Sequence, residues 1–236
     1  MTKSFGIILF IEHDDTPLKY LIYQRRDSNA FIKLMRKLGN DNPLELATGL
    51  TLEEKDRLRN YSFDEIWDDL FVNHSCRCYN VERRRASSNY FNLKKTGIID
   101  KITAVEGNTP LSWGFPKGRI DKRDDNEIEC AYREFREETG MPTDDLELPL
   151  HLNCYEYKIA DDYFAKYYPA KTDVMYEIKY KKVEGRIRDT YVTDESNDLK
   201  WVTVEEAKNY LESPHIDFLI DLDKKIKSGD KTINLD

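Results

Sequence analysis

Cysteine is scarce in this sequence, with four cysteines in 236 residues. They lie far apart and are too few for a disulfide framework: Cys76, Cys78, Cys130 and Cys154. The C-x-C pair formed by the first two has no second pair at zinc-binding spacing, which argues against a structural zinc site. We therefore expect reduced thiols, as in a cytoplasmic protein.

Long apolar runs are also lacking. No stretch reaches about 18 consecutive apolar residues, so the sequence predicts no membrane span. Residues 4–11 (SFGIILFI) are apolar, but one basic residue precedes them and no small-residue cleavage site follows. They favour a first strand over a signal peptide. With 35% charged and 39% hydrophobic residues, the composition is typical of a globular protein with one large domain or two small ones.

Positive charge is not in excess, because the formal net charge is −8. This balance is not typical of a nucleic-acid-binding protein, although local clusters decide such binding more than the sum does. Clustered carboxylates are also the ligands that hard divalent cations prefer. The places where acidic residues gather are therefore candidate metal sites.

Strand-forming sequence flanks a polar turn near the N-terminus. Residues 4–11 and 19–25 are separated by the polar stretch HDDTP, which predicts a β-hairpin. Further strands are expected around 151–159, 173–182 and 198–203. A helix is predicted to end at Gly140, a typical C-cap residue, and a last helix is expected from Thr203 to about Ile226.

Between the hairpin and residue 104 the pattern is helical. Residues 30–38 place four apolar side chains on one helix face: Phe31, Leu34, Met35 and Leu38. Thr51 and the two glutamates after it form a helix-capping signature, and residues 61–72 predict a further helix. We predict an α/β (α+β) fold in which a discontinuous domain, 1–27 and 104–236, is interrupted by a mainly helical insertion at 28–103.

Three glutamates gather on one face of the helix that precedes Gly140. Glu134, Glu137 and Glu138 lie at positions i, i+3 and i+4, which share a helix face. On an isolated helix such like charges cost roughly a few tenths of a kcal/mol per pair. A divalent cation such as Mg²⁺ or Mn²⁺ removes that cost and prefers oxygen ligands. The apolar residues on the other side are expected to face the core: Ile128, Ala131 and Phe135.

The alternative is a solvated acidic face, which is common on helices. The loop before the helix favours the metal site, because residues 114–119 (GFPKGR) place two glycines and two cations there. Tight backbone and positive charge beside clustered carboxylates suit a diphosphate bound with a metal. Lys117, Gly118 and Arg119 are therefore candidate phosphate-binding residues.

Residues 118–141 resemble the Nudix box, G-x5-E-x7-R-E-U-x-E-E-x-G-U, where U is a bulky apolar residue. The half that begins at Arg133 (REFREETGM) matches every fixed position. The first half departs from the box. Counting back from Arg133 places the first acidic position on Asp125, which six residues instead of five separate from Gly118, whereas Asp124 restores the first spacing and breaks the second. The chain is identified as a member of the Nudix family, with an extra loop residue as the explanation of this departure.

This resemblance implies a metal-dependent pyrophosphohydrolase with the α/β/α sandwich and mixed sheet of the family. It implies Mg²⁺ or Mn²⁺ ligands at Glu134, Glu137 and Glu138, and activation of the water by Glu134 or a later glutamate such as Glu138. Arg133 is implied to hold the glutamates in place, and Gly140 to have a structural role in the box.

Three further features resemble the mRNA-decapping members of the family. Residues 113–119 (WGFPKGR) are similar to a W-G-F-P-K-G-K stretch of those enzymes. Asp194-Glu195 before Trp201 resembles a segment whose glutamate approaches the metals, which implies that Glu195 is a fourth acidic ligand or the general base. The alternative is an ordinary loop carboxylate. The layout of strands, insertion and box is similar to decapping enzymes of large DNA viruses, especially asfarviruses.

The resemblance implies removal of the 5′ cap of mRNA, with release of m7GDP and a 5′-monophosphate RNA, in the host cytoplasm if the protein is viral. Related W-x-x-P-K-G stretches occur in hydrolases of diphosphoinositol polyphosphates and dinucleoside polyphosphates, which are the alternative substrates. A third hypothesis is an inactive Nudix module that only binds RNA or protein. The intact box glutamates argue against it.

A basic segment near the end of the predicted insertion is the candidate RNA-binding surface. Its cations are Arg83, Arg84, Arg85, Lys94 and Lys95. Tyr79, Tyr90 and Phe91 lie among them and could stack on bases while the cations contact phosphates. The alternative is a solvated helix face whose aromatic residues belong to the core.

The remaining aromatic and imidazole side chains receive no assignment. Trp67 and Trp113 could stack on a cationic methylguanine, but Trp67 lies in an amphipathic helix and is expected in the core. The histidines are isolated and form no metal-ligand pattern: His13, His74, His151 and His215. No role is predicted for them.

Overall fold

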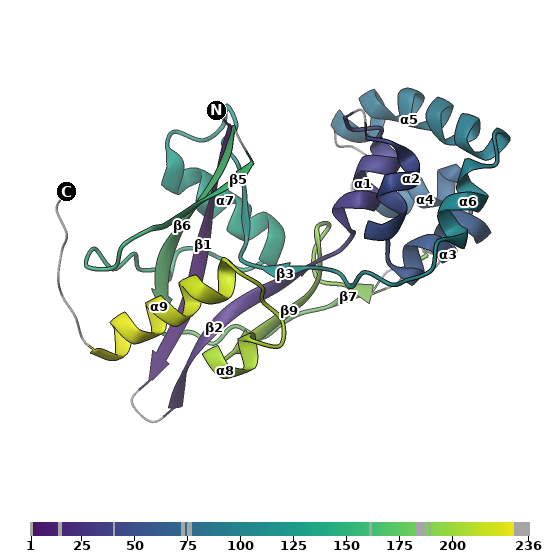
Figure 1. The fold of residues 1–236 in the computed structure, drawn as a ribbon. Helices are drawn as coiled ribbons and strands as arrows, with labels where there is room; N and C mark the ends of the chain where they lie inside the picture. The colour runs from purple at the N-terminus through teal and green to yellow at the C-terminus, as the bar shows by residue number, and fades with distance from the viewer. Residues whose placement is uncertain are drawn as a thin grey trace. The chain divides into compact units, whose positions relative to one another are not determined.

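The structure is a computed structural model, which describes residues 2–13, 16–39, 41–71, 74, 77–160, 162–182, 187–188 and 190–228 (Figure 1). The chain divides into two compact units. The sheet unit comprises Met1–Gln24, Trp113–Lys179 and Asp198–Asp236, and the helical unit comprises Arg25–Ser112 and Tyr180–Asn197. Each unit is built from segments that are distant in the sequence.

The helical unit has wider boundaries than the predicted insertion at 28–103, since it also includes residues 25–27, 104–112 and 180–197. A buried ion network explains why the segment 180–197 belongs to it. Arg188 contacts Asp27 at 2.9 Å and Asp69 at 3.0 Å. Arg57 contacts the same two carboxylates at 2.8 and 3.0 Å, and Arg26 contacts Asp69 at 3.2 Å. Helical periodicity carries no signal for such long-range ion pairs.

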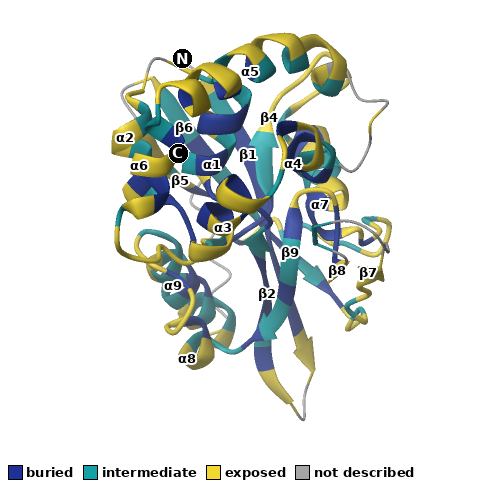
Figure 2. Cartoon of the chain, turned by 90° about the vertical axis from the view of Figure 1, so that its right-hand side faces the viewer, coloured by how far each residue is buried: buried dark blue, intermediate teal, exposed yellow. Residues whose placement is uncertain are grey.

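The predicted hairpin forms the middle of the sheet. Strand β1 (Thr2–His13) pairs antiparallel with β2 (Thr16–Arg25), with Phe10 opposite Tyr20. Figure 2 shows buried residues through the middle of β2 and exposed residues at its hairpin end. In β1, residues 4–11 are all buried, which confirms that they form a core strand.

The sheet is mixed. Strand β6 (Tyr163–Thr172) runs parallel to β1, and β5 (Tyr155–Ala160) runs antiparallel to β6. The order is β3-β2-β1-β6-β5, with β3 (Trp113–Gly114) on β2, β4 (Lys117–Arg119) on β1 and β9 (Ser196–Val202) on β2. The predicted mixed sheet is confirmed.

The strand expected at 173–182 is wrong. Residues 174–180 have no regular structure, and the long strand lies just before them, at Tyr163–Thr172. Pro169 and three charged or polar positions weaken its strand signal in the sequence. Proline has no backbone N–H to donate to a neighbouring strand. The pairing of β6 with β5 ends at Tyr167, so Pro169 lies beyond the residues that pair with β5, and β6 accommodates it.

One helix packs on each face of the sheet. Side chains alternate along β1, and Ile8 and Phe10 join a core cluster with Leu219 and Leu222 of α9 (His215–Ser228). Helix α7 (Glu127–Thr139) packs on the opposite face of β1 (Figure 1). The predicted sandwich of helix, sheet and helix is confirmed.

The prediction of a single last helix from Thr203 to about Ile226 is wrong in the number of helices. Two helices are present, α8 (Val204–Ala207) and α9, because Pro214 lies between them. Proline lacks an N–H and disfavours helical backbone in the residue before it. The cap predicted at Thr203 is present, since Thr203 and Glu206 form a capping box.

The helical unit is an arrangement of short helices around its own core. Its elements are α1 (Asn29–Arg36), α2 (Pro43–Leu46), a 3-10 turn at Ala47–Gly49, α3 (Leu52–Asn60), α4 (Phe63–Leu70), α5 (Arg77–Lys95), α6 (Ile98–Ala104), β7 (Lys181–Lys182) and β8 (Thr190–Tyr191). Phe31, Leu34 and Met35 are buried as predicted, whereas Leu38 lies beyond the end of α1 and is half-buried. Trp67 is fully buried, which confirms its core assignment.

One buried carboxylate caps the beginnings of two helices in this unit. Glu54 accepts from the backbone N–H of Thr51, the N-cap of α3, at 2.9 Å, which confirms the predicted cap. It also accepts from the N–H and the hydroxyl of Ser28, the N-cap of α1, at 2.7 and 2.8 Å. Glu54 therefore fixes the backbone where α1 and α3 start.

Two further expectations can be compared with the fold. None of the helices in the described part of the chain combines the length and apolarity that a membrane span requires. The thiols of Cys78, Cys130 and Cys154 are free, and only that of Cys130 is buried. Cys76 lies outside the described residues.

Candidate active site

Helix α7 presents the acidic face of the site. Asn126 caps its beginning by accepting from the N–H groups of Ile128 and Glu129, and Gly140 ends it at a left-handed φ of 70°. Ala131 and Phe135 are buried against the sheet as expected. Ile128 was expected in the core but is 37% exposed, because it lies in the first turn, at the edge of the packed face.

Arg133 joins the carboxylates of the box. Its Nη1 donates to Oε1 of Glu134 at 2.7 Å and to Oε2 of Glu137 at 3.0 Å. Its Nη2 donates to the carbonyl oxygen of Arg119 at 3.0 Å, so the helix is also tied to the loop before it. Arg133 therefore contacts two of the box glutamates, and its role in holding them in place stays a prediction.

Asp124 is one of the two candidates for the first acidic position of the box, and it contacts Arg133 directly. Both of its carboxylate oxygens accept from Arg133, from Nε at 2.8 Å and from Nη2 at 2.8 Å. These bonds hold the pKa of the Asp124 carboxyl well below its usual range. Asp125 is exposed. The spacing left the choice between Asp124 and Asp125 open, and the contacts with Arg133 favour Asp124.

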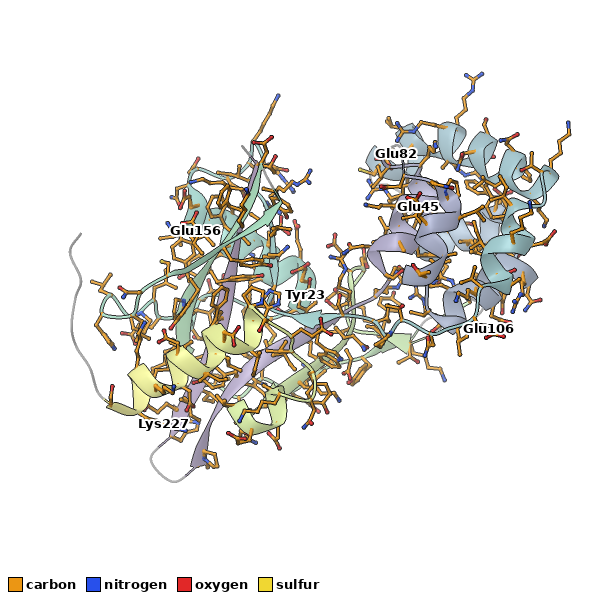
Figure 3. The ribbon with its side chains drawn as sticks, in the orientation of Figure 1. Tyr23, Glu45, Glu82, Glu106, Glu156 and Lys227 are labelled. Atoms are coloured by element: carbon orange, nitrogen blue, oxygen red, sulfur yellow. The ribbon has the colours of Figure 1, made fainter. Side chains whose placement is uncertain are left out.

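Glu138 is the most enclosed of the three box glutamates. It is 4% exposed, whereas the side chains of Glu134 and Glu137 are 13% and 44% exposed. The backbone N–H of Lys117 donates to Oε2 of Glu138 at 2.7 Å, and the hydroxyl of Tyr23 donates to Oε1 at 3.0 Å. Tyr23 (labelled in Figure 3) comes from β2 and was not found by the sequence reasoning, since 115 residues separate it from Glu138.

Gly118 lies directly against the acidic helix. A Cβ built on Gly118 would overlap the carboxyl group of Glu134, so no other residue fits without moving that carboxylate. Gly6 on β1 has a similar role, because a Cβ there would overlap the carbonyl oxygen of Pro116. Gly118 thus leaves room for the carboxyl group of Glu134, and Gly6 leaves room for the backbone at Pro116.

A half-buried histidine lies against the same loop. The hydroxyls of Tyr167 and Tyr157 are 3.1 and 3.4 Å from Nε2 of His215, and the ring of Phe115 meets its ring edge-on at 5.6 Å. Burial, together with the nearby charge of Lys117, lowers the pKa of His215 to about 4. No role was predicted for His215, whose partners come from strands that are distant in the sequence.

The donor set of the site is suited to a hard divalent cation. Glu134, Glu137 and Glu138 supply only carboxylate oxygens, which Mg²⁺ and Mn²⁺ prefer. Among the described residues, no group of three or more His, Cys, Asp or Glu side chains stands in a metal-binding arrangement. Here the charge of Arg133 lies between Glu134 and Glu137. The carboxylates of the three glutamates are thus chemically suited to a divalent cation. In this structure they accept hydrogen bonds from Arg133, Tyr23 and the backbone N–H of Lys117.

Glu195 belongs to the helical unit, whereas the box glutamates belong to the sheet unit. Its carbonyl oxygen accepts from the N–H of Arg26 at 2.9 Å, and its own N–H donates to the hydroxyl of Thr193 at 3.2 Å. The side chain of Glu195 is exposed. Its role at the metal stays a prediction.

The five predicted RNA-binding cations lie on α5, but they differ in how they are engaged. Arg83 is paired with Asp64 at 2.6 Å, and Arg85 donates to the carbonyl oxygen of Arg36 at 3.3 Å. The other three are exposed: Arg84, Lys94 and Lys95. Figure 2 shows α5 with a largely exposed outer side.

The aromatic residues expected among these cations separate into two groups. Tyr90 is 3% exposed and belongs to the core, and the hydroxyl of Tyr79 donates to Asp68 at 2.6 Å. Phe91 is 56% exposed. Of the three, only Phe91 has a ring that is available for stacking on a base. Glu82 of α5, which is labelled in Figure 3, pairs with Arg36 of α1 at 2.7 Å.

The sequence matches the family model of the NUDIX domain over residues 99–222, just over half of the chain. The protein therefore belongs to the Nudix family. Enzymes of this family generally use divalent metal ions, in agreement with the oxygen donors of α7.

Among known proteins, the chain is similar to the mRNA-decapping protein g5R of African swine fever virus, with 24% identity over 158 residues, 63% of each chain. It is similar to a putative mRNA-decapping protein of Acanthamoeba polyphaga mimivirus, with 34% identity over 105 residues, 44% of this chain and 28% of that one. It also matches the m7GpppN-mRNA hydrolase of Saccharomyces cerevisiae, with 45% identity over 47 residues, 20% of this chain and 5% of that one. The chain thus spans less than two thirds of each of these relatives.

Proposed function

We propose that this protein is a divalent-metal-dependent Nudix hydrolase that removes the 5′ cap of mRNA, releasing m7GDP and a 5′-monophosphate RNA. The observation that carries the hydrolase is the assembly of Glu134, Glu137 and Glu138 with Arg133 and Asp124 beside the Gly118 loop. The names of the viral and yeast relatives support capped RNA as the substrate.

In this proposal Glu134, Glu137 and Glu138 hold Mg²⁺ or Mn²⁺. When bound, the cation would neutralise phosphate charge and make a water more acidic. Glu134 or Glu138 would act as the base toward the attacking water, with Glu195 as the alternative base or a fourth ligand. Arg133 and Asp124 keep the glutamates together, and Tyr23 orients Glu138 through its hydroxyl. Lys117, Gly118 and Arg119 bind the phosphates.

The body of the RNA is proposed to follow the outer side of α5. Arg84, Lys94 and Lys95 supply exposed cations, and Phe91 supplies an exposed ring for stacking. Arg83 and Arg85 contribute charge but already have protein partners. Affinity for RNA should then fall steeply with salt, because cations that contact phosphates release bound counterions.

The test is incubation with RNA labelled in the cap, with Mg²⁺ or Mn²⁺, followed by identification of the released nucleotide. The expected product is m7GDP, and it should be lost in Glu138→Gln, where an amide replaces the carboxylate that accepts from Tyr23 and Lys117. Glu129→Gln is the matched control, since Glu129 is an exposed glutamate of the same helix. Release of m7GDP by Glu138→Gln at the wild-type rate would contradict the assignment of the site.

The alternative substrates are diphosphoinositol polyphosphates and dinucleoside polyphosphates. The exposed cation of Arg119 and the half-buried cation of Lys117 are suited to any polyphosphate, so these compounds should be assayed beside capped RNA. If the protein hydrolyses them and leaves capped RNA intact, the decapping proposal is wrong, and the assignment as a Nudix hydrolase stands.

A further inference from the structure

The register of β4 divides the active-site loop between the two faces of the sheet. Gly118 lies opposite Phe5 of β1, on the face covered by α7, where it meets Glu134. Lys117 and Arg119 lie opposite Gly6 and Ser4. Their side chains therefore extend on the other face, because neighbouring residues of a strand point to opposite sides. The phosphate-binding cations and the box carboxylates are on opposite sides of one short strand.

Tyr163 meets both cations on that second face. It lies at the start of β6, where β6 pairs with the first residues of β1. Its ring centroid is 5.9 Å from Nζ of Lys117 and 5.3 Å from Cζ of Arg119. Its hydroxyl lies 2.7 Å from the hydroxyl of Ser4, which is fully buried. Two cations and two hydroxyls thus converge on one half-buried ring.

The electrostatics of this cluster favour an anion. Burial alone would raise the pKa of the Tyr163 phenol, but the charges of Lys117 and Arg119 and the hydrogen bond with Ser4 lower it below its usual value. A phenol in such a field is a stronger hydrogen-bond donor to a negatively charged oxygen. Cations with hydroxyl donors beside them are a suitable environment for phosphate groups, because hydrogen bonds to ionised acceptors are the strong ones.

We propose that Tyr163, Lys117 and Arg119 form a polyphosphate subsite on the sheet face opposite α7, in which the buried Ser4 positions the hydroxyl of Tyr163. This inference rests on the proposed function: the subsite holds the part of the phosphate chain that lies away from the carboxylates. Between the two lies Gly118, whose lack of a side chain leaves room for the carboxyl group of Glu134. Tyr163 is then a binding residue that determines how many phosphates the site accepts.

The experiment measures the binding of inorganic pyrophosphate and tripolyphosphate by calorimetry in EDTA, so that neither turnover nor a metal contributes. In Tyr163→Phe, which keeps the ring and removes the hydroxyl, tripolyphosphate should bind about tenfold more weakly, the effect expected for one hydrogen bond to a charged group. Pyrophosphate binding should change less than tripolyphosphate binding. Lys117→Ala should weaken both.

Tyr168→Phe is the matched control. Tyr168 lies on the same strand but on the face of α7, where its hydroxyl donates to Glu127 at 2.8 Å. Binding by this variant should match that of the wild type. Equal affinity of Tyr163→Phe and the wild type for tripolyphosphate, or an equal loss in Tyr168→Phe, would overturn the subsite.

The two proposals can fail separately. If Tyr163→Phe loses tripolyphosphate affinity while the wild type leaves capped RNA intact, the subsite stands and the decapping proposal falls. With capped RNA as substrate, Tyr163→Phe should raise KM and leave kcat within about twofold, since Tyr163 has no contact with the carboxylates of α7. A fall in kcat at unchanged KM would contradict a role in binding alone.

Discussion

His215 should make the stability of the protein depend on pH between about 4 and 6.5. Its imidazole is enclosed by Phe115, Tyr157 and Tyr167, and the charged group near it is Lys117, which also disfavours the imidazolium. Its pKa in the fold is about 4, against 6.5 for the free side chain. The protonated form therefore fits the unfolded chain better than the folded one.

The sign and size follow from linkage. Between pH 6.5 and 4 the unfolded state binds more protons at this site, so stability is present in full above 6.5 and is lost as pH falls. A difference of about 2.5 pKa units corresponds to about 3 kcal/mol once the pH is below both values. About 2 kcal/mol of this should be lost between pH 7.5 and pH 5.

The measurement is urea denaturation of the wild type and His215→Gln at pH 7.5 and pH 5. Glutamine cannot titrate, so the variant should lose about 2 kcal/mol less than the wild type over this range. The comparison cancels the titration of every other group that the two proteins share. Equal pH dependence in the two proteins would refute the reasoning, because it would mean that His215 is protonated as easily in the fold as outside it.

Three other substitutions test the architecture of the site and of the helical unit. Gly118→Ala should reduce hydrolysis by at least about tenfold, measured by turnover, because its Cβ displaces the carboxylate of Glu134. The Kd for RNA, measured by filter binding, should be unchanged, since the body of the RNA is proposed to bind at α5. Asp124→Asn should destabilise the protein by about 2 kcal/mol and reduce turnover, whereas Asp125→Asn should change neither, as thermal unfolding and a turnover assay will show. Glu54→Ala should cost about 3 kcal/mol in urea denaturation, since buried donors at two helix starts lose their acceptor; a cost below about 1 kcal/mol would contradict its capping role.

The acidic helix could be predicted from the sequence because its signals are local. Three glutamates at helical spacing and a C-terminal glycine lie within seven residues, and the structure gives α7 with its end at Gly140. The choice between Asp124 and Asp125 could not be made by counting. It depends on how the loop folds back onto Arg133, which only the contacts reveal.

The residues that the sequence reasoning missed reach the site through the sheet. Tyr23 comes from β2 and Tyr163 from β6, and the pairing of strands decides which side chains point to which face. Strand pairing over such distances leaves no short pattern in the sequence. The wrong prediction of a strand at 173–182 has a related cause. Residues Tyr163–Thr172 form the strand instead, despite Pro169, because they pair with β1 and β5.

The ion network around Asp27 and Asp69 has a consequence for genetics. Arg188 reaches these aspartates from a segment that the gene encodes more than 100 codons after Asp27. A gene fragment for residues 25–112 alone would lack this guanidinium, whereas a fusion that appends 180–197 would restore it. A chimera that takes the helical unit from a relative would likewise need both segments from that relative, so that the two halves of the ion network come from the same protein.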